Sequence, residues 1–113
     1  MGAYAVGSVK VFLDDVREAP PGWVRTRTPE QTISLLRSGN VTALSLDHDL
    51  GLDTRESERS GYSVLLWLER EIGEGRWRSR LPEIEIHSAN PAGQERMRRA
   101  LEAILRLHGR WTA

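Results

Sequence analysis

Three short polar runs contain most of the side chains in this sequence that could do chemistry. They are Leu13-Asp14-Asp15-Val16-Arg17, Ser45-Leu46-Asp47-His48-Asp49-Leu50-Gly51 and Ile86-His87-Ser88-Ala89-Asn90-Pro91. Each run follows a short stretch rich in Val, Leu or Ile, which is typical of a β-strand. If these strands are parallel, their carboxyl ends meet at one edge of a sheet, where open α/β folds bind ligands. Carboxylates, two imidazoles, a hydroxyl and an amide would then share one cleft, and that concentration of ionisable groups points to an enzyme.

The carboxylates among these residues suggest a metal site. Asp14 and Asp15 directly follow one predicted strand, and Asp47 ends another. Three carboxylates at adjoining strand ends form an oxygen-rich pocket, which suits Mg²⁺ better than Zn²⁺. Mg²⁺ is therefore a candidate cofactor, with Asp14, Asp15 and Asp47 as its candidate ligands. The alternative for an adjacent acid pair is a turn or cap whose acids face water.

Two histidines suggest acid–base chemistry. His48 lies between Asp47 and Asp49, and either neighbour can favour the imidazolium and orient one ring nitrogen. His87 ends a later predicted strand and is expected nearby. Two imidazoles close together can divide the roles of general base and general acid in phosphodiester cleavage. The catalytic candidates are therefore His48, His87, Asp47 and Asp49, against the alternative that His48 is a solvent-exposed loop residue without a task.

Three further residues are candidates for binding a phosphate. Arg17 carries the forked guanidinium that holds phosphate through two parallel hydrogen bonds, although a surface ion pair with Glu18 or Glu30 would also account for it. Ser88 and Asn90 precede a proline, so either could be the ordinary N-cap of a helix. The same geometry points free backbone N–H groups toward the strand-end cleft, where an anion can bind.

Length and composition narrow the class of protein. The 113 residues predict a single domain over residues 1–113, and the net charge of zero lacks the basic excess of a nucleic-acid-binding protein. The arginines crowd the C-terminal third, which we interpret mainly as solvated helix faces and secondarily as an attraction for an anionic ligand. There is no cysteine, so a thiolate site is excluded. No apolar run approaches the roughly 20 residues that span a bilayer, and the first 11 residues lack a signal-peptide core, so a soluble cytoplasmic protein is expected.

Predicted strands and helices alternate along the chain. Strands are predicted at residues 9–13, 23–27, 41–46 and 83–87. Helices are predicted from Thr28, as N-cap, to Gly39 or Asn40, and over residues 61–72 and 91–108. Pro20-Pro21-Gly22 forbids a helix between the first two strands. The polar residues 51–60 are a candidate lid over the cleft.

This alternation predicts an α/β fold, a three-layer sandwich in which helices cover both faces of a short, mainly parallel four-stranded sheet. Right-handed crossovers give the strand order 2-1-3-4, with residues 23–27 at an edge. Helical spacing predicts a buried stripe on each helix, formed by Ile33, Leu35 and Leu36, by Val64, Leu65, Leu68 and Ile72, and by Met97, Leu101, Ile104 and Leu105.

The motifs resemble the receiver domain of bacterial response regulators. In that family an acid pair holds Mg²⁺, an Asp at the end of the third strand accepts a phosphoryl group, and a Ser or Thr contacts that group. The resemblance places these roles on Asp14, Asp15, Asp47 and Ser88. It implies a receiver or flavodoxin-like fold, but one lacking the fifth strand and its Lys, because the chain ends after the last predicted helix. A receiver also has a helix after its first strand, where this chain has its proline pair.

A closer resemblance is to the family of cyclic-phosphate processing receiver-like domains. Its motifs correspond here to Leu13-Asp14-Asp15-Val16-Arg17-Glu18-Ala19-Pro20-Pro21-Gly22-Trp23, to Ser45-Leu46-Asp47-His48-Asp49-Leu50-Gly51 and to His87-Ser88-Ala89-Asn90-Pro91-Ala92-Gly93. The resemblance implies a phosphodiesterase that hydrolyses a cyclic phosphate on a nucleotide or RNA end to a phosphomonoester. The 2′,3′-cyclic phosphates and ADP-ribose cyclic phosphate are the implied substrates.

On this interpretation His48 and His87 share the general base and acid roles while water attacks the phosphorus. Asp47 or Asp49 orients His48, and the acid pair either binds Mg²⁺ or orients His87. The phosphate-binding candidates neutralise the oxygens that gain charge in the transition state. One alternative is a Mg²⁺-dependent signalling domain phosphorylated on Asp47. Another is a module that binds a cyclic or terminal phosphate without converting it.

Overall fold

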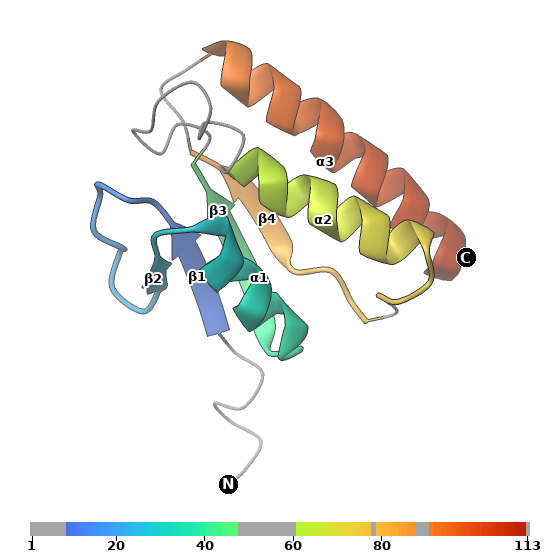
Figure 1. Cartoon of the computed structure of the whole chain (residues 1–113), viewed down its shortest axis with the longest axis horizontal. Helices are drawn as coiled ribbons and strands as arrows, with labels where there is room; N and C mark the ends of the chain where they lie inside the picture. Colours follow the sequence, from blue (N-terminus) through green and yellow to red (C-terminus); the bar gives the residue numbers. More distant parts are fainter. Residues whose placement is uncertain (1–8, 48–60, 78, 88–90, 113) are drawn as a thin grey trace, which may run out of the picture.

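The computed structural model describes residues 9–47, 61–77, 79–87 and 91–112 of the chain. Within them, four strands form one sheet and three helices connect or follow the strands (Figure 1). The strands are β1 (Val9–Leu13), β2 (Val24–Thr26), β3 (Val41–Leu46) and β4 (Glu83–Ile86), and the helices are α1 (Pro29–Arg37), α2 (Gly61–Gly73) and α3 (Pro91–Thr112). Neighbouring strands are parallel and follow the order β2-β1-β3-β4. The predicted receiver-like α/β fold, the strand order and the edge position of β2 are therefore confirmed.

Local sequence signals explain where α1 begins and ends. The Thr28 hydroxyl accepts the backbone N–H of Gln31, and Pro29 occupies the first turn, where its missing N–H leaves no helical bond unmade. The chain leaves the helix through Ser38 and Gly39, and Gly39 has a φ of 81°, which favours glycine. Only three residues therefore separate the end of the helix from the start of β3 at Val41.

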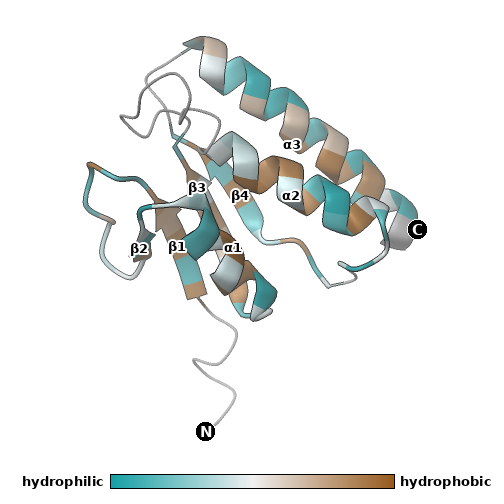
Figure 2. Cartoon of the chain, in the orientation of Figure 1, coloured by the Kyte–Doolittle hydropathy of each residue, from teal (hydrophilic) through white to brown (hydrophobic). Residues whose placement is uncertain are grey.

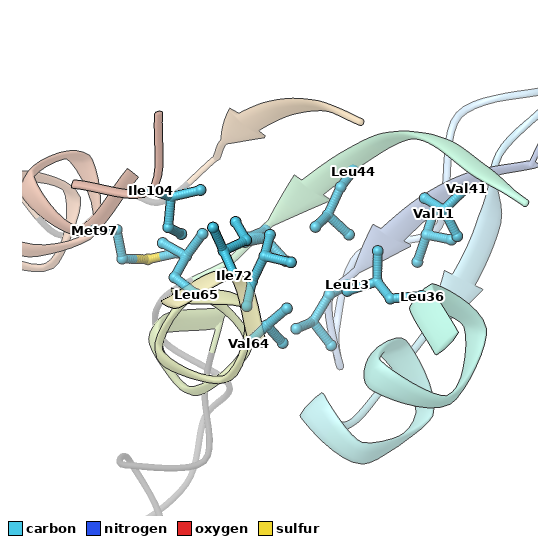
Figure 3. Close-up of a cluster of buried hydrophobic side chains, with 12 residues drawn as sticks. Val11, Leu13, Leu36, Val41, Leu44, Val64, Leu65, Ile72, Met97 and Ile104 are labelled. Atoms are coloured by element: carbon cyan, nitrogen blue, oxygen red, sulfur yellow. The ribbon is translucent and has the colours of Figure 1, made fainter. Parts of the chain in front are cut away.

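The hydrophobic core lies between one face of the sheet and the helices. Val11, Leu13, Leu44 and Leu46 of the strands are fully buried there. They pack with residues from all three helices, as Figure 3 shows for Leu36, Val64, Leu65, Ile72, Met97 and Ile104. The predicted stripe of α2 is fully buried, and Ile33 and Leu35 of α1 are half-buried at the core margin.

Two expectations for α3 are wrong. Leu105 is 54 % exposed, because α3 lies beside the edge strand β4 and buries a narrower stripe than the spacing suggests. The helix also continues past His108 to Thr112, since a glycine such as Gly109 in a helix costs only about 1 kcal/mol relative to alanine and does not have to end it. His108 contacts the Ser79 carbonyl through Nε2, at 2.8 Å, and this contact anchors the last turns. Figure 2 shows hydrophobic and hydrophilic residues alternating along α3, as expected for an amphipathic helix.

The expectation that helices cover both faces of the sheet is not met by the described helices. In Figure 1, α1 and α2 lie in front of the sheet and α3 lies beside α2, and both α1 and α3 contact α2. The physical reason is the handedness of the connections. The right-handed crossovers from β2 to β3 and from β3 to β4 run in the same direction across the sheet, so their helices fall on the same face. Only the connection from β1 to β2 runs the opposite way, and that connection contains Pro20-Pro21-Gly22 rather than a helix.

The second face of the sheet is the one that the described helices do not cover, and its strand residues are more polar than those in the core. Phe12 of β1, Ser45 of β3 and Glu85 of β4 are in register across this face. Phe12 and Ser45 are nevertheless buried, with exposed fractions of 9 % and 2 %.

No helix within the described residues is long and apolar enough to span a membrane.

Candidate active site at the strand ends

Three of the predicted site residues come together where the strands end. Asp14, Asp47 and His87 directly follow β1, β3 and β4. The Asp47 N–H donates to the Leu13 carbonyl at 3.2 Å, and the His87 N–H donates to the Leu46 carbonyl at 2.9 Å. These backbone bonds extend the ladder by one residue beyond the strands, so the sheet itself sets the spacing of the three side chains.

Asp14 is built into the site from several sides. Its carboxylate is 1 % exposed, and Oδ1 accepts the backbone N–H groups of Val16 and Arg17 at 2.8 and 2.7 Å. Its own N–H donates to the Thr26 carbonyl, and its carbonyl accepts the Arg25 Nε–H at 3.0 Å. Burial alone would raise the pKa of Asp14, but the two backbone N–H donors and the His87 contact outweigh burial and lower it. Asp14 is therefore a carboxylate at neutral pH.

His87 has a partner at each ring nitrogen and another against its ring face. Nε2 lies 3.1 Å from Asp14 Oδ2, and Nδ1 lies 2.6 Å from Ser45 Oγ. The imidazole stacks on the Phe12 ring, with 4.2 Å between centroids and 5° between planes. Burial lowers the pKa of His87 most strongly, and the positive charge of Arg17 also lowers it, against the opposing effect of Asp14. The imidazole is therefore neutral at neutral pH.

The arrangement of donor atoms fits a divalent cation. Asp14, Asp47 and His87 each offer one ligand atom, and the three atoms lie within 4.8 Å of one another. Two carboxylate oxygens and an imidazole nitrogen suit Mn²⁺ or Zn²⁺ as well as Mg²⁺. The predicted set of three acids thus shares Asp14 and Asp47 with this cluster, which contains His87 in place of Asp15. Oδ1 of Asp15 is buried and has no hydrogen-bond partner within the described part of the chain.

The other predicted site residues divide into two groups. Arg17 is exposed beside Asp14, and its charge acts on His87, so it stands at the mouth of the site. His48, Asp49, Ser88, Asn90 and residues 51–60 lie outside the described residues.

Sequence reasoning missed Ser45 and Phe12 as parts of this site. Both lie inside strands: Phe12 comes just before the first polar run, and Ser45 is the first residue of the second. Both contact His87. The available signal was a serine within the otherwise apolar end of β3, two residues before Asp47. A buried hydroxyl needs a hydrogen-bond partner, and in a strand that partner is often on a neighbouring strand.

Comparison with known proteins identifies the family. The family model of the cyclic-phosphate processing receiver domain matches residues 9–103. No curated protein and no solved structure matches the chain. The matched range contains all four strands, the whole of α1 and α2, and Asp14, Asp47 and His87. This chain therefore belongs to the family of cyclic-phosphate processing receiver domains.

Proposed function

We propose that this protein is a phosphodiesterase that hydrolyses a cyclic phosphate on a nucleotide or RNA end to a phosphomonoester. One observation carries the proposal. A histidine held at both ring nitrogens, by Ser45 and Asp14, stands beside Asp47 at the carboxyl edge of a parallel sheet. A fold does not need this arrangement for its stability, and the carboxyl edge is where open α/β sheets bind ligands. The membership of a family described by cyclic-phosphate processing supplies the substrate class.

The reaction requires a nucleophile, a proton acceptor and a proton donor. Water attacks the phosphorus, one ester P–O bond of the ring breaks, the water loses a proton to a base, and the departing oxygen gains one. His48 and His87 divide these two roles in our proposal, with Asp47 or Asp49 orienting His48. Arg17 is consistent with a phosphate substrate, because its exposed guanidinium lies beside the site and matches the geometry of a phosphate group. Ser88 and Asn90 are proposed as further phosphate donors.

The acidic residues can serve in two ways, by orienting His87 and by binding a metal ion. Asp14 accepts a hydrogen bond from His87 and so orients it. Asp14, Asp47 and His87, with Asp15 as the further candidate, would hold a divalent ion. Such an ion supplies Lewis-acid polarisation of a phosphoryl oxygen.

The test is ³¹P NMR on a panel of cyclic phosphates, each with Mg²⁺ and with EDTA. The panel contains 2′,3′-cyclic mononucleotides, RNA ending in a 2′,3′-cyclic phosphate, and ADP-ribose 1″,2″-cyclic phosphate. Conversion of one substrate to a monoester is the expected result. His48→Ala and His87→Ala are expected to lower the rate by about 10² to 10⁴ if the residues act as acid and base. His108→Ala is the matched control, because His108 contacts Ser79 at the far end of α3.

Two other results would replace the proposal. Phosphorylation of Asp47 by acetyl phosphate with Mg²⁺, without conversion of any ester, would identify a signalling domain. The observation that favours this alternative is the position of Asp47 at the end of β3, beside Asp14. Calorimetric binding of a cyclic phosphate without product would identify a non-catalytic binding module.

A further inference from the structure

The hydroxyl of Ser45 lies beneath the catalytic candidate His87. Ser45 is 2 % exposed, and its Oγ lies 2.6 Å from His87 Nδ1. Water and substrate therefore have no access to this hydroxyl, which excludes it as a nucleophile. Its chemical effect must pass through the imidazole that covers it.

The hydrogen-bond partners determine which nitrogen of His87 carries the proton. An ionised Asp14 can only accept, so the contact between Nε2 and Oδ2 requires a hydrogen on Nε2. In a neutral imidazole the other nitrogen then has a lone pair, and Nδ1 must accept. Ser45 can donate to it, because a hydroxyl is both a donor and an acceptor. One chain of donation results, from Ser45 to His87 to Asp14.

Phe12 completes the restraint on the imidazole. Its ring lies parallel to that of His87, at 4.2 Å between centroids, and this contact holds the plane of the imidazole. Ser45 and Asp14 engage the two nitrogens and so fix the rotation of the ring within that plane. A ring flip would place carbon atoms opposite both polar partners. His87 is therefore held in one orientation before any ligand binds.

We propose that Ser45 is a positioning residue, which holds His87 with a hydrogen on Nε2 facing the cleft, so that His87 donates a hydrogen bond and does not act as the base. This inference rests on the proposed function and narrows the role of His87 in it to that of a hydrogen-bond donor. Nε2–H would donate to the phosphate oxygen that gains charge as the ring opens, and would share that hydrogen with Asp14 until a ligand arrives. The lone pair of the neutral ring points at Ser45, so the attacking water must give its proton to another group, which can return that proton to the departing oxygen.

The first experiment identifies the protonated nitrogen without any substrate. Long-range ¹H–¹⁵N correlation spectra of the histidine-labelled, EDTA-treated protein near neutral pH are expected to show His87 with its hydrogen on Nε2. In Ser45→Ala the Nδ1 resonance is expected to move toward that of an unbonded imidazole nitrogen, and Ser45→Thr is expected to restore it. Ser38→Ala is the control, since Ser38 bonds Leu35 at the end of α1. A hydrogen on Nδ1 in the wild type, or an Nδ1 resonance that Ser45→Ala leaves in place, would overturn the proposal.

The second experiment separates this inference from the proposed function. With a substrate identified by ³¹P NMR, Ser45→Ala is expected to lower kcat roughly tenfold, the order of effect of one lost hydrogen bond, with little change in KM. Ser45→Thr should recover most of the rate. Full activity in Ser45→Ala, despite an altered spectrum, would overturn the positioning role. If no substrate is hydrolysed but the ¹H–¹⁵N spectra show the expected changes, the phosphodiesterase proposal fails and the effect of Ser45 on His87 stands. Thermal melting shows that each variant is folded, and Ser45→Cys, which keeps the volume with a weak donor, replaces Ser45→Ala if that variant does not fold.

Discussion

Gly61, the first residue of α2, is where one added methyl group should damage both the fold and the site. A Cβ at this position would lie 2.6 Å from the Asp47 carbonyl oxygen, 2.8 Å from Met97 Cε and 2.9 Å from Leu46 Cβ. The Gly61 N–H also donates to the same Asp47 carbonyl at 2.9 Å, so the start of the helix rests directly on the end of β3. Gly61→Ala must therefore move either the helix or the strand that presents Asp47.

The size of the effect follows from what can move. Met97 ends in a flexible side chain, but the closest neighbour is a backbone oxygen that belongs to the sheet. Overpacking of a core costs typically about 1–3 kcal/mol, and the backbone contact argues for the upper part, about 2–3 kcal/mol. For a chain of 113 residues this corresponds to a fall in Tm of roughly 8–12 °C.

The same helix provides a matched control. Gly73, at the other end of α2, has nothing within 4 Å of an added Cβ. Gly73→Ala should leave stability unchanged or raise it by up to about 1 kcal/mol, because alanine favours helices over glycine. Urea and thermal unfolding of both variants, with activity or metal binding as a readout of Asp47, make the comparison. Equal stability of Gly61→Ala and Gly73→Ala would refute the close contact between α2 and the end of β3.

Three further predictions concern the site. The pKa values of Asp14 and His87 are both lowered in the folded state, so the unfolded chain binds more protons than the folded chain as the pH falls. The free energy of unfolding in EDTA should therefore be highest above about pH 6.5 and decline below it. The decline should come first from His87 and then, in the acid range, from Asp14. Urea midpoints that stay level or rise between about pH 7 and about pH 5 would contradict this sign. Phe12→Leu should cost about 1–2 kcal/mol in urea unfolding, since it removes the stacking with His87 as well as buried area, and an effect near zero would argue against the stacked pair. Mn²⁺ or Zn²⁺ should raise the Tm of the wild type by binding the folded state, and Asp47→Asn should abolish most of that rise; an equal rise in the variant would place the ion elsewhere.

Much of the fold could be predicted because its signals are local. The apolar runs of β1 and β3 end in charged residues, and Thr28 with Pro29 marks the start of α1. The arrangement of helices on one face also follows from right-handed connections, once the direction of each crossover is considered. The alternation of strands and helices does not by itself place helices on both faces. The connection from β1 to β2 could supply the other layer, but it contains two prolines and no helix.

The site was predictable to the extent that it consists of strand ends. Asp14, Asp47 and His87 were expected together and lie together, because parallel strands in register bring their carboxyl ends to one edge. The contacts of Ser45 and Phe12 with His87 were not predictable from spacing. Phe12 lies in β1 and His87 follows β4, and β3 lies between these two strands, so the imidazole reaches Phe12 across the intervening strand. No periodicity along one strand reports such a contact.

The placement of the described helices on one face of the sheet has a consequence for how this chain tolerates mutation. Strand residues that face the helices, such as Leu13 and Leu44, are fully buried, and substitutions there should be rejected for loss of packing. Alternate positions on the other face, such as Lys10 and Glu83, are exposed and should accept many residues. A comprehensive substitution library would therefore show tolerance at these outward positions, but constraint at Phe12 and Ser45, which are buried on the same face. At Ser45 the loss should be of activity more than of abundance.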